Sequence, residues 1–203
     1  MLLLFGLAHP ARGQSDREVA ERIVATLPAS PQGWSAAAFS EAQFRHVQDH
    51  GALYVDVIRE ALSWPASERL LEDEDAIRLY GTLLPLLVTA RGEASRHFMD
   101  EVFQAAARRY DRLQQSVDSQ GNRAKSAILA EELFMPLADV MRLSIEGLRY
   151  SEDDRLLDEV MSRYDAIQES ARSACVAYVR QFSPGNPKAE KWLQDRGLAP
   201  ATR

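Results

Sequence analysis

The sequence predicts an all-α protein, and three observations lead to that prediction. Apolar residues recur at intervals of three and four along most of the chain, which is the spacing of one face of an α-helix. Alternating patterns rich in Val, Ile and Thr, which indicate strands, are nearly absent. Gly and Pro gather in a few places between the periodic segments. We therefore expect an antiparallel helical bundle of four to five long helices with short helices at both ends. A helical solenoid is the second choice.

The first two helices are expected over residues 15–27 and from Ser40 to the Trp64-Pro65 pair that closes the second one. Ser15 and Ser40 each precede an apolar-periodic segment and are followed three residues later by Glu or Gln, which is the capping-box pattern. Pro28 ends the first helix because it cannot continue the backbone hydrogen bonds. The apolar stripe of the second helix runs through without a break, so one continuous helix is expected there.

The middle of the chain predicts three further helices. Proline lies inside two of them, at Pro85 and Pro136, and each proline removes one backbone donor, so a kink is expected at both places. The expected ranges are 66–91, interrupted at the acidic run 72–75, then 93–118, and then from the turn at 121–122 to about 150.

The C-terminal part predicts the longest helix and a short one after it. Seven apolar positions at helical spacing place the longest helix at about 152–182. Asn186 as a cap, followed by Pro187 in the first turn, begins the short helix. Gly197 ends it, and Leu198 is placed to pack back in a Schellman-type closure.

The beginning of the chain has the pattern of a secretory signal peptide over residues 1–13. The first eight residues are continuously apolar, and small residues then lead to a cleavage position after Gly13. We expect a bundle domain over 14–183, a short helix with a tail over 184–203, and a periplasmic or secreted location. No basic residue precedes the apolar run, so the alternatives are a start further upstream or an apolar tail on a cytoplasmic protein. The run is too short to span a bilayer, and no later stretch qualifies.

Composition excludes several classes of function. The formal net charge of −6 argues against nucleic acids and anionic membranes as partners. Cys175 is the only cysteine, so no intramolecular disulfide forms, and its apolar neighbours predict a buried thiol. The sequence has no phosphate-binding glycine loop, no cysteine pair and no common hydrolase motif. It therefore names no cofactor and favours a non-catalytic protein.

Two positions are candidates for binding a metal ion. His46 and His50 are four residues apart, which places both imidazoles on one helical face. Two histidines supply half of a zinc shell, so other ligands must come from elsewhere. Glu131 occupies an apolar stripe position and offers an inward carboxylate. The alternatives are two half-exposed histidines beside the core, and an Arg partner for Glu131 from a neighbouring helix.

Two functional hypotheses follow. The first is an exported, non-catalytic protein of adaptor, chaperone or inhibitor type that contacts another protein, with Trp34 and Trp192 as anchors. Either tryptophan could instead close an end of the bundle. The second is a helical bundle that binds a metal or another ligand through His46, His50 and Glu131. The apolar stripes do not distinguish a bundle formed by one chain from a bundle completed by a second copy, so both a monomer and an oligomer are compatible with the sequence.

Export predicts the mass of the mature protein. When the protein is expressed with its leader, native mass spectrometry should find a chain that begins at Gln14. A chain that retains its first 13 residues would contradict export and return the protein to the cytoplasm.

Overall fold

The computed structural model describes residues 15–27, 40–62, 74–90, 92–120, 134–148, 154, 156–165, 167 and 169–198. Within these ranges all regular secondary structure is helical and no strand occurs, which confirms the all-α prediction. None of the helices described has both the length and the apolar character needed to cross a bilayer. The helices are α1 (Asp16–Thr26), α2 (Glu41–Asp49), α3 (Gly51–Ala61), α4 (Glu74–Ala90), α5 (Glu93–Gln120), α7 (Met135–Leu148), α8 (Leu157–Arg163), α9 (Glu169–Phe182) and α10 (Pro187–Asp195).

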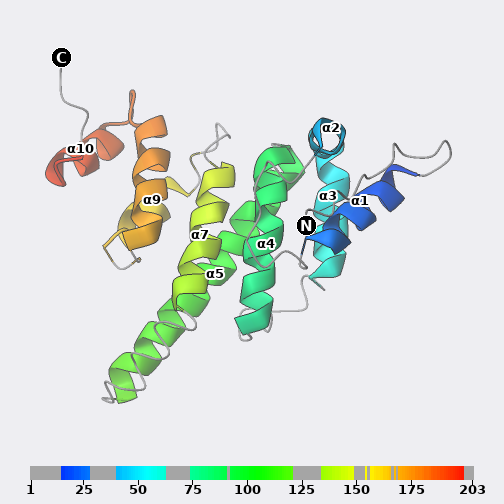
Figure 1. Ribbon diagram of the computed structural model, residues 1–203. Helices are drawn as coiled ribbons and strands as arrows, with labels where there is room; N and C mark the ends of the chain where they lie inside the picture. Colours follow the sequence, from blue (N-terminus) through cyan, green and yellow to red (C-terminus); the bar gives the residue numbers. More distant parts are fainter. Residues whose placement is uncertain are drawn as a thin grey trace, which may run out of the picture.

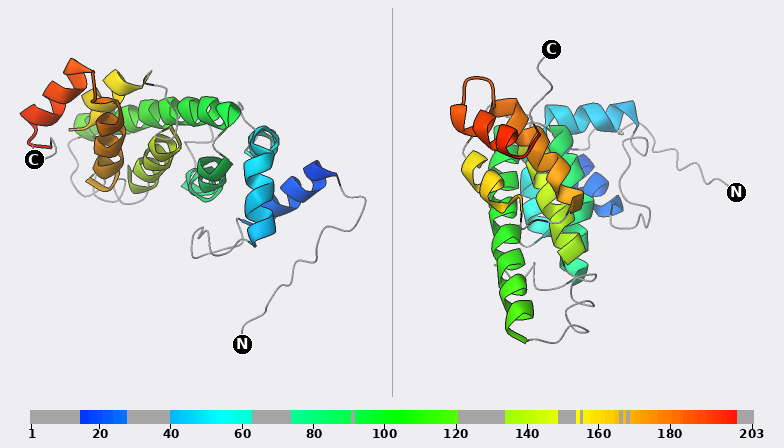
Figure 2. Two further views of the ribbon diagram at one scale, coloured as in Figure 1. Left: turned by 90° about the horizontal axis from the view of Figure 1, so that it is seen from above. Right: turned by 90° about the vertical axis from the view of Figure 1, so that its left-hand side faces the viewer.

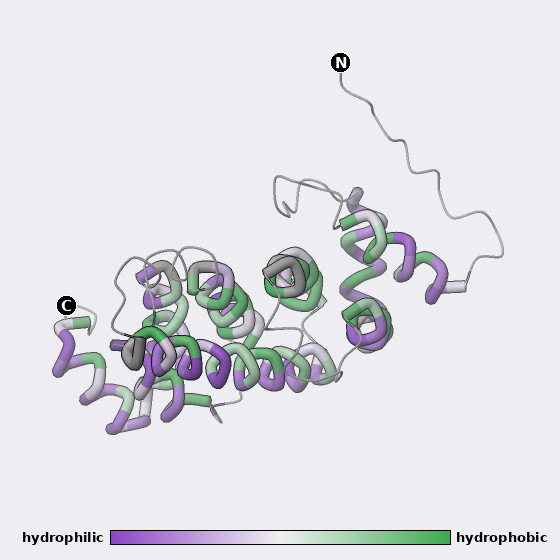
Figure 3. Tube along the Cα trace, turned by 90° about the horizontal axis from the view of Figure 1, so that it is seen from below, coloured by the Kyte–Doolittle hydropathy of each residue, from purple (hydrophilic) through white to green (hydrophobic). Residues whose placement is uncertain are grey.

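The helices form a row with one long helix across it. Helices α9, α7, α4 and α3 lie side by side, with α10 and α1 at the two ends of the row (Figure 1). The long helix α5 crosses one side of the row and packs against α7, α4 and α3 (Figure 2). Hydrophobic residues lie mainly along the inner helices, whereas α1 and α10 are predominantly hydrophilic (Figure 3). The core is therefore centred on α7, which contacts α4, α5 and α9.

Local signals in the sequence placed several helix ends correctly. The Ser40 hydroxyl accepts a hydrogen bond from the Gln43 N–H at 3.3 Å, and the Gln43 side chain accepts from the Ser40 N–H at 2.9 Å. This reciprocal pair is the predicted capping box. Gly197 has a φ of +64°, and the Leu198 N–H donates to the Leu193 carbonyl at 2.8 Å, which confirms the Schellman closure.

The single helix expected from Ser40 to Trp64 is broken, and this prediction was wrong. His50 has φ −121° and ψ 33°, outside helical values, and it separates α2 from α3. Figure 1 shows α2 nearly end-on and α3 along its length, so the chain bends sharply at His50. The residue after the bend explains it, because a Cβ on Gly51 would lie 3.1 Å from the Cβ of Ala90 and 3.3 Å from its carbonyl oxygen. The periodicity of the stripe continues through the bend and gave no sign of this close approach.

The helix expected over 152–182 is also broken, into α8 and α9. Its first described α-helical residue is Leu157, and the chain leaves the helix after Arg163. The Arg172 side chain donates to the carbonyls of Ile167 at 3.2 Å and Asp165 at 3.3 Å, so a side chain satisfies acceptors that an unbroken helix would use itself. No Gly or Pro lies in this stretch to announce the break.

Most of the predicted stripe positions are nevertheless buried. Helix α5 covers and slightly extends the expected range 93–118, and α4 begins inside the acidic run. The Cys175 side chain is buried as expected, and burial raises the pKa of its thiol to about 12. The buried stripe residues include Ile23, Val47, Tyr54, Ile58, Ile77, Tyr80, Leu84, Leu87, Met99, Val102, Ala106, Tyr110, Leu113, Phe134, Ala138, Met141, Ile145, Leu157, Val160, Ile167, Ala171 and Tyr178.

Some expectations fall outside the described residues. These include the leader over 1–13, Trp34, the turn at 121–122 and Glu131. Pro85 lies inside α4, which continues through it, and Pro136 is the second residue of α7. The kinks expected at these two prolines remain predictions.

Two glycine substitutions should separate rigid from flexible packing. Gly51→Ala should lower the free energy of unfolding by about 1–3 kcal/mol, because the new methyl group meets the Ala90 backbone, which cannot move aside. At Gly147 the new methyl would meet the flexible Met99 side chain at 3.0 Å. Alanine also favours a helix by about 1 kcal/mol over glycine, so Gly147→Ala should cost less than about 1 kcal/mol. Urea unfolding measures both values, and equal losses would contradict this reading of the α3–α4 contact.

Candidate metal site

Three potential metal ligands meet where α1 lies beside α2. Asp16, His46 and His50 each offer one ligand atom, and these atoms all lie within 4.8 Å of one another. The Nε2 atom of His46 is 3.7 Å from the Oδ1 atom of Asp16, and the two imidazole centroids are 4.5 Å apart. Within the described ranges this is the one group of three or more such residues. It combines the two histidines predicted from the sequence with a carboxylate that was not predicted.

Each ligand is positioned by a helix end. Asp16 is the first residue of α1, where the dipole of the helix favours a carboxylate. His46 lies in the last turn of α2, and the His50 N–H donates to the His46 carbonyl at 3.1 Å. The two imidazoles therefore remain one helical turn apart, as the spacing predicted, although the helix ends at His50. The apolar face of α1 packs on α3, which carries Asp16 to this place.

Tyr54 holds the imidazole of His46 from behind. Its side chain is fully buried, and its Oη atom lies 2.9 Å from the Nδ1 atom of His46. In a straight helix these two residues would be separated by about 12 Å along the axis, so the bend at His50 is what brings them together. With the imidazole proton on Nδ1, that N–H donates to Oη and the lone pair of Nε2 is left for another partner.

The Nε2 atom of His46 lacks such a partner within the described structure. This atom is buried and makes no hydrogen bond, and the whole side chain is only 17% exposed. Buried polar atoms in folded proteins are nearly always paired, and an unpaired one calls for an explanation such as a bound ion. The nearest acid, Asp16, lies beyond hydrogen-bonding distance at 3.7 Å.

The electrostatic surroundings keep His46 neutral. Burial lowers the pKa of His46 below its ordinary value of 6.5, and the neighbouring His50 lowers it further. Asp16 opposes this shift without reversing it. Neutral imidazole is the form that binds a metal ion, because the lone pair must be free. The fold therefore holds His46 in its metal-binding protonation state at neutral pH.

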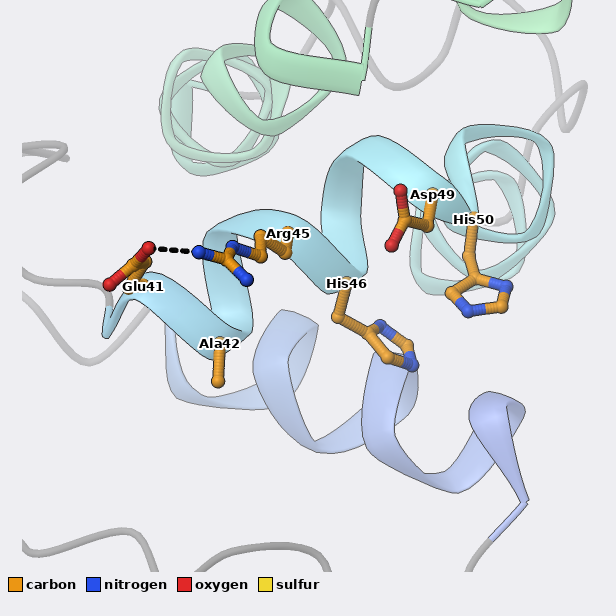
Figure 4. Close-up of a pocket in the computed structure, with 6 residues that line it drawn as sticks. All are labelled: Glu41, Ala42, Arg45, His46, Asp49 and His50. Atoms are coloured by element: carbon orange, nitrogen blue, oxygen red, sulfur yellow. Dashed lines mark hydrogen bonds and ion pairs between the residues drawn. The ribbon is translucent and has the colours of Figure 1, made fainter.

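The histidines lie along an open pocket with a volume of about 390 Å³. In Figure 4, His46 points towards α1, and His50 lies at the bend on the same side of α2. The ion pair between Glu41 and Arg45 occupies the other end of the pocket. Asp49 lines the pocket as well but is not part of the ligand group.

The separation between His46 and Asp16 is close to that required by one metal ion, whereas the group as a whole, whose ligand atoms lie within 4.8 Å of one another, must close further around it. Zinc binds imidazole nitrogen and carboxylate oxygen at about 2.0–2.1 Å, so two ligand atoms on one tetrahedral ion lie roughly 3.3 Å apart. The separation of 3.7 Å between His46 and Asp16 exceeds this by a few tenths of an ångström. The exposed Asp16 side chain can make this adjustment by rotating, because it is 64% exposed.

The other predicted site residues are not brought to this place by the described structure. Glu131 and Trp34 fall outside the described ranges. The Trp192 side chain is half-buried, and its Nε1–H donates to the Met161 carbonyl at 3.2 Å. Its ring contacts Tyr164 edge to face at 5.1 Å, so it ties α10 to α8. A partner-binding role for Trp192 remains a prediction.

Asp16 and Tyr54 were not predicted from the sequence as residues of this site. An acid in the first turn of a helix is ordinary, so Asp16 carried no sign of a second role. Tyr54 was expected in the core stripe, and only the bend turns its hydroxyl towards His46.

The lowered pKa of His46 predicts how pH affects stability without metal. The unfolded chain takes up a proton near pH 6.5, whereas folded His46 takes one up only at lower pH. In the presence of a chelator, the free energy of unfolding should therefore fall as the pH decreases through about 6.5. Above that pH this contribution is constant, because His46 is neutral in both states.

Urea unfolding across about pH 5–8 tests this prediction. His46→Gln should remove the part of the fall in the free energy of unfolding that His46 causes. His97→Gln is the control, because His97 is a half-exposed side chain on α5, and it should keep the decline. Parallel curves for wild type and His46→Gln would contradict the assignment.

Comparison with known proteins found no matching family model, no matching curated protein and no matching solved structure. Function is therefore inferred from the geometry and chemistry of the chain alone.

Proposed function

We propose that this protein binds a divalent transition-metal ion through Asp16, His46 and His50. One observation carries the proposal: among the described residues, the buried Nε2 atom of His46 has no hydrogen-bond partner, and it faces a carboxylate and a second imidazole. A metal ion would give this nitrogen the partner that it lacks.

The donor set favours a first-row transition metal. Imidazole nitrogens suit zinc, copper, iron and nickel, whereas calcium and magnesium prefer oxygen ligands throughout. Two neutral imidazoles and one carboxylate neutralise half of the ion's charge, and His46 is held neutral by its surroundings. Zinc is the simplest probe because it has no redox chemistry.

Tyr54 would act as an outer-shell residue in this site. Histidine ligands usually donate their second ring N–H to a fixed acceptor, which sets the ring orientation and the tautomer. Tyr54 offers that acceptor at 2.9 Å from the Nδ1 atom of His46. Glu131 remains in the proposal as the further inward carboxylate expected from the sequence.

The proposal also includes the bundle arrangement, the export and the protein contact expected from the sequence. Contacts of α7 with α4, α5 and α9 support the antiparallel bundle of four to five long helices. Export to the periplasm or the medium, and contact with another protein through Trp34 and Trp192, stay predictions.

Zinc titration of the full chain tests the proposal. Isothermal titration calorimetry at pH 7.5 (about one unit above the ordinary pKa of histidine) should find one zinc ion per chain. Substitution of any single ligand in His46→Ala, His50→Ala or Asp16→Ala should weaken binding by more than about tenfold. Tyr54→Phe should weaken it by about 10–100-fold, because the outer-shell acceptor is lost while the ligands stay.

A matched control lies on α5. His97 faces Glu93 with Nε2 and Oε1 3.8 Å apart, which resembles the His46–Asp16 pair but lacks a second imidazole. His97→Ala should therefore leave zinc binding unchanged. Failure of the wild type to bind zinc would overturn the proposal, as would binding that survives both His46→Ala and His50→Ala.

A further inference from the structure

We propose that metal binding clamps α1 onto the rest of the protein, so that the metal controls the attachment of this helix. The inference rests on the proposed function and concerns what that site regulates. Its starting point is the origin of the ligands: Asp16 opens α1, whereas His46 and His50 come from α2 and from its joint with α3. An ion shared by these residues links two segments that are otherwise joined by packing and exposed polar contacts.

Helix α1 depends on docking for its stability. Helix α1 has 11 residues, and helices shorter than about 12–15 residues are marginal in water by themselves. It lies at the end of the row, outside the layer formed by the inner helices (Figure 2). Its fold therefore depends on docking, which buries one apolar face consisting of Ala20, Ile23, Val24 and Leu27.

The polar contacts between α1 and its neighbours in the described structure hold it weakly. Arg17 and Glu60 form an ion pair at 2.5 Å, but their side chains are 45% and 64% exposed, and such exposed pairs contribute little to stability. The approach of Asp16 to His46 at 3.7 Å is not a hydrogen bond. The first turn of α1 thus faces a buried nitrogen that it does not reach.

A metal ion would close this gap. Binding requires the Asp16 oxygen and the His46 nitrogen to approach roughly 3.3 Å, and each then has a direct bond to the ion. Detached α1 cannot supply Asp16, so the complete site exists only when α1 is docked. Zinc can also bind His46 and His50 when α1 is detached, so it shifts the docking equilibrium by at most the ratio of its affinities for the docked and the detached state. That ratio equals the contribution of Asp16 to binding, which we expect to be more than about tenfold.

Hydrogen exchange measures the docking of α1 directly. The full-length protein is compared with a chelator and with zinc at about 100 times its Kd, followed by mass spectrometry of peptides. Amides of residues 15–27 should exchange about tenfold more slowly with zinc, because they exchange through detachment of α1 and zinc binds the docked state more tightly by the contribution of Asp16. Amides of α9, which lies on the far side of α7, should be unaffected and serve as the internal control.

Two variants of α1 sharpen the test. Asp16→Ala keeps both histidines, so it should still bind zinc at a higher concentration but should lose the slowing of exchange over 15–27. Glu21→Ala removes another exposed acid of the same helix, which pairs with Arg17 rather than with a histidine. It should keep the full slowing.

The outcomes separate this inference from the proposed function. Zinc binding that depends on His46 and His50, with unchanged exchange of α1, would overturn the clamp and leave the metal site intact. Slowing that persists in saturated Asp16→Ala would also overturn the clamp. Absence of zinc binding would overturn both proposals together. Slowing that requires zinc and Asp16 but not Glu21 would establish the clamp.

Discussion

The contact between Gly51 and Ala90 is the constraint on which the N-terminal half of the structure depends. At this point α3 begins against the end of α4, and a Cβ on Gly51 would lie 3.1 Å from the Ala90 Cβ. The absence of a side chain lets α3 approach α4 closely while the chain bends at His50. With α3 held in this direction, its buried face receives α1, and Tyr54 points back to α2. A straight helix over the same residues would offer neither contact.

This bend also accounts for the chemistry of the candidate site. It buries the Tyr54 hydroxyl beside His46, so one ring nitrogen has a fixed neighbour at 2.9 Å while the other faces α1. Burial and the neighbouring His50 lower the pKa of His46, which favours a neutral ring. A buried nitrogen without a partner costs free energy, and proteins keep such an atom mainly where a ligand or an ion compensates it. The unpaired nitrogen of His46 therefore costs free energy in the unbound protein, and a bound metal ion would remove that cost.

Prediction from the sequence succeeded where the interactions are local. The Ser40 capping box and the closure at Gly197 each involve residues within one or two turns, so the residues that identify them lie close together in the sequence. The long helix expected over 93–118 was predicted correctly because its apolar stripe is regular. The break at His50 was not found, because it depends on a residue distant in sequence, and the break after Arg163 was not found, because no Gly or Pro marks it. One involves Ala90 across the α3–α4 contact, and the other involves the carbonyl contacts of Arg172.

The sequence by itself determined the helical class, most helix ends and the pairing of His46 with His50. These follow from hydrogen bonds and side-chain spacing within a few residues, which any helix of this composition would share. Only the tertiary structure decided that Asp16 joins the two histidines and that Tyr54 lies behind His46. Both contacts link residues that a straight chain would keep apart, and their positions follow from how α1, α2 and α3 pack. A metal site assembled from separate helices is therefore visible in the packing and not in any single segment of sequence.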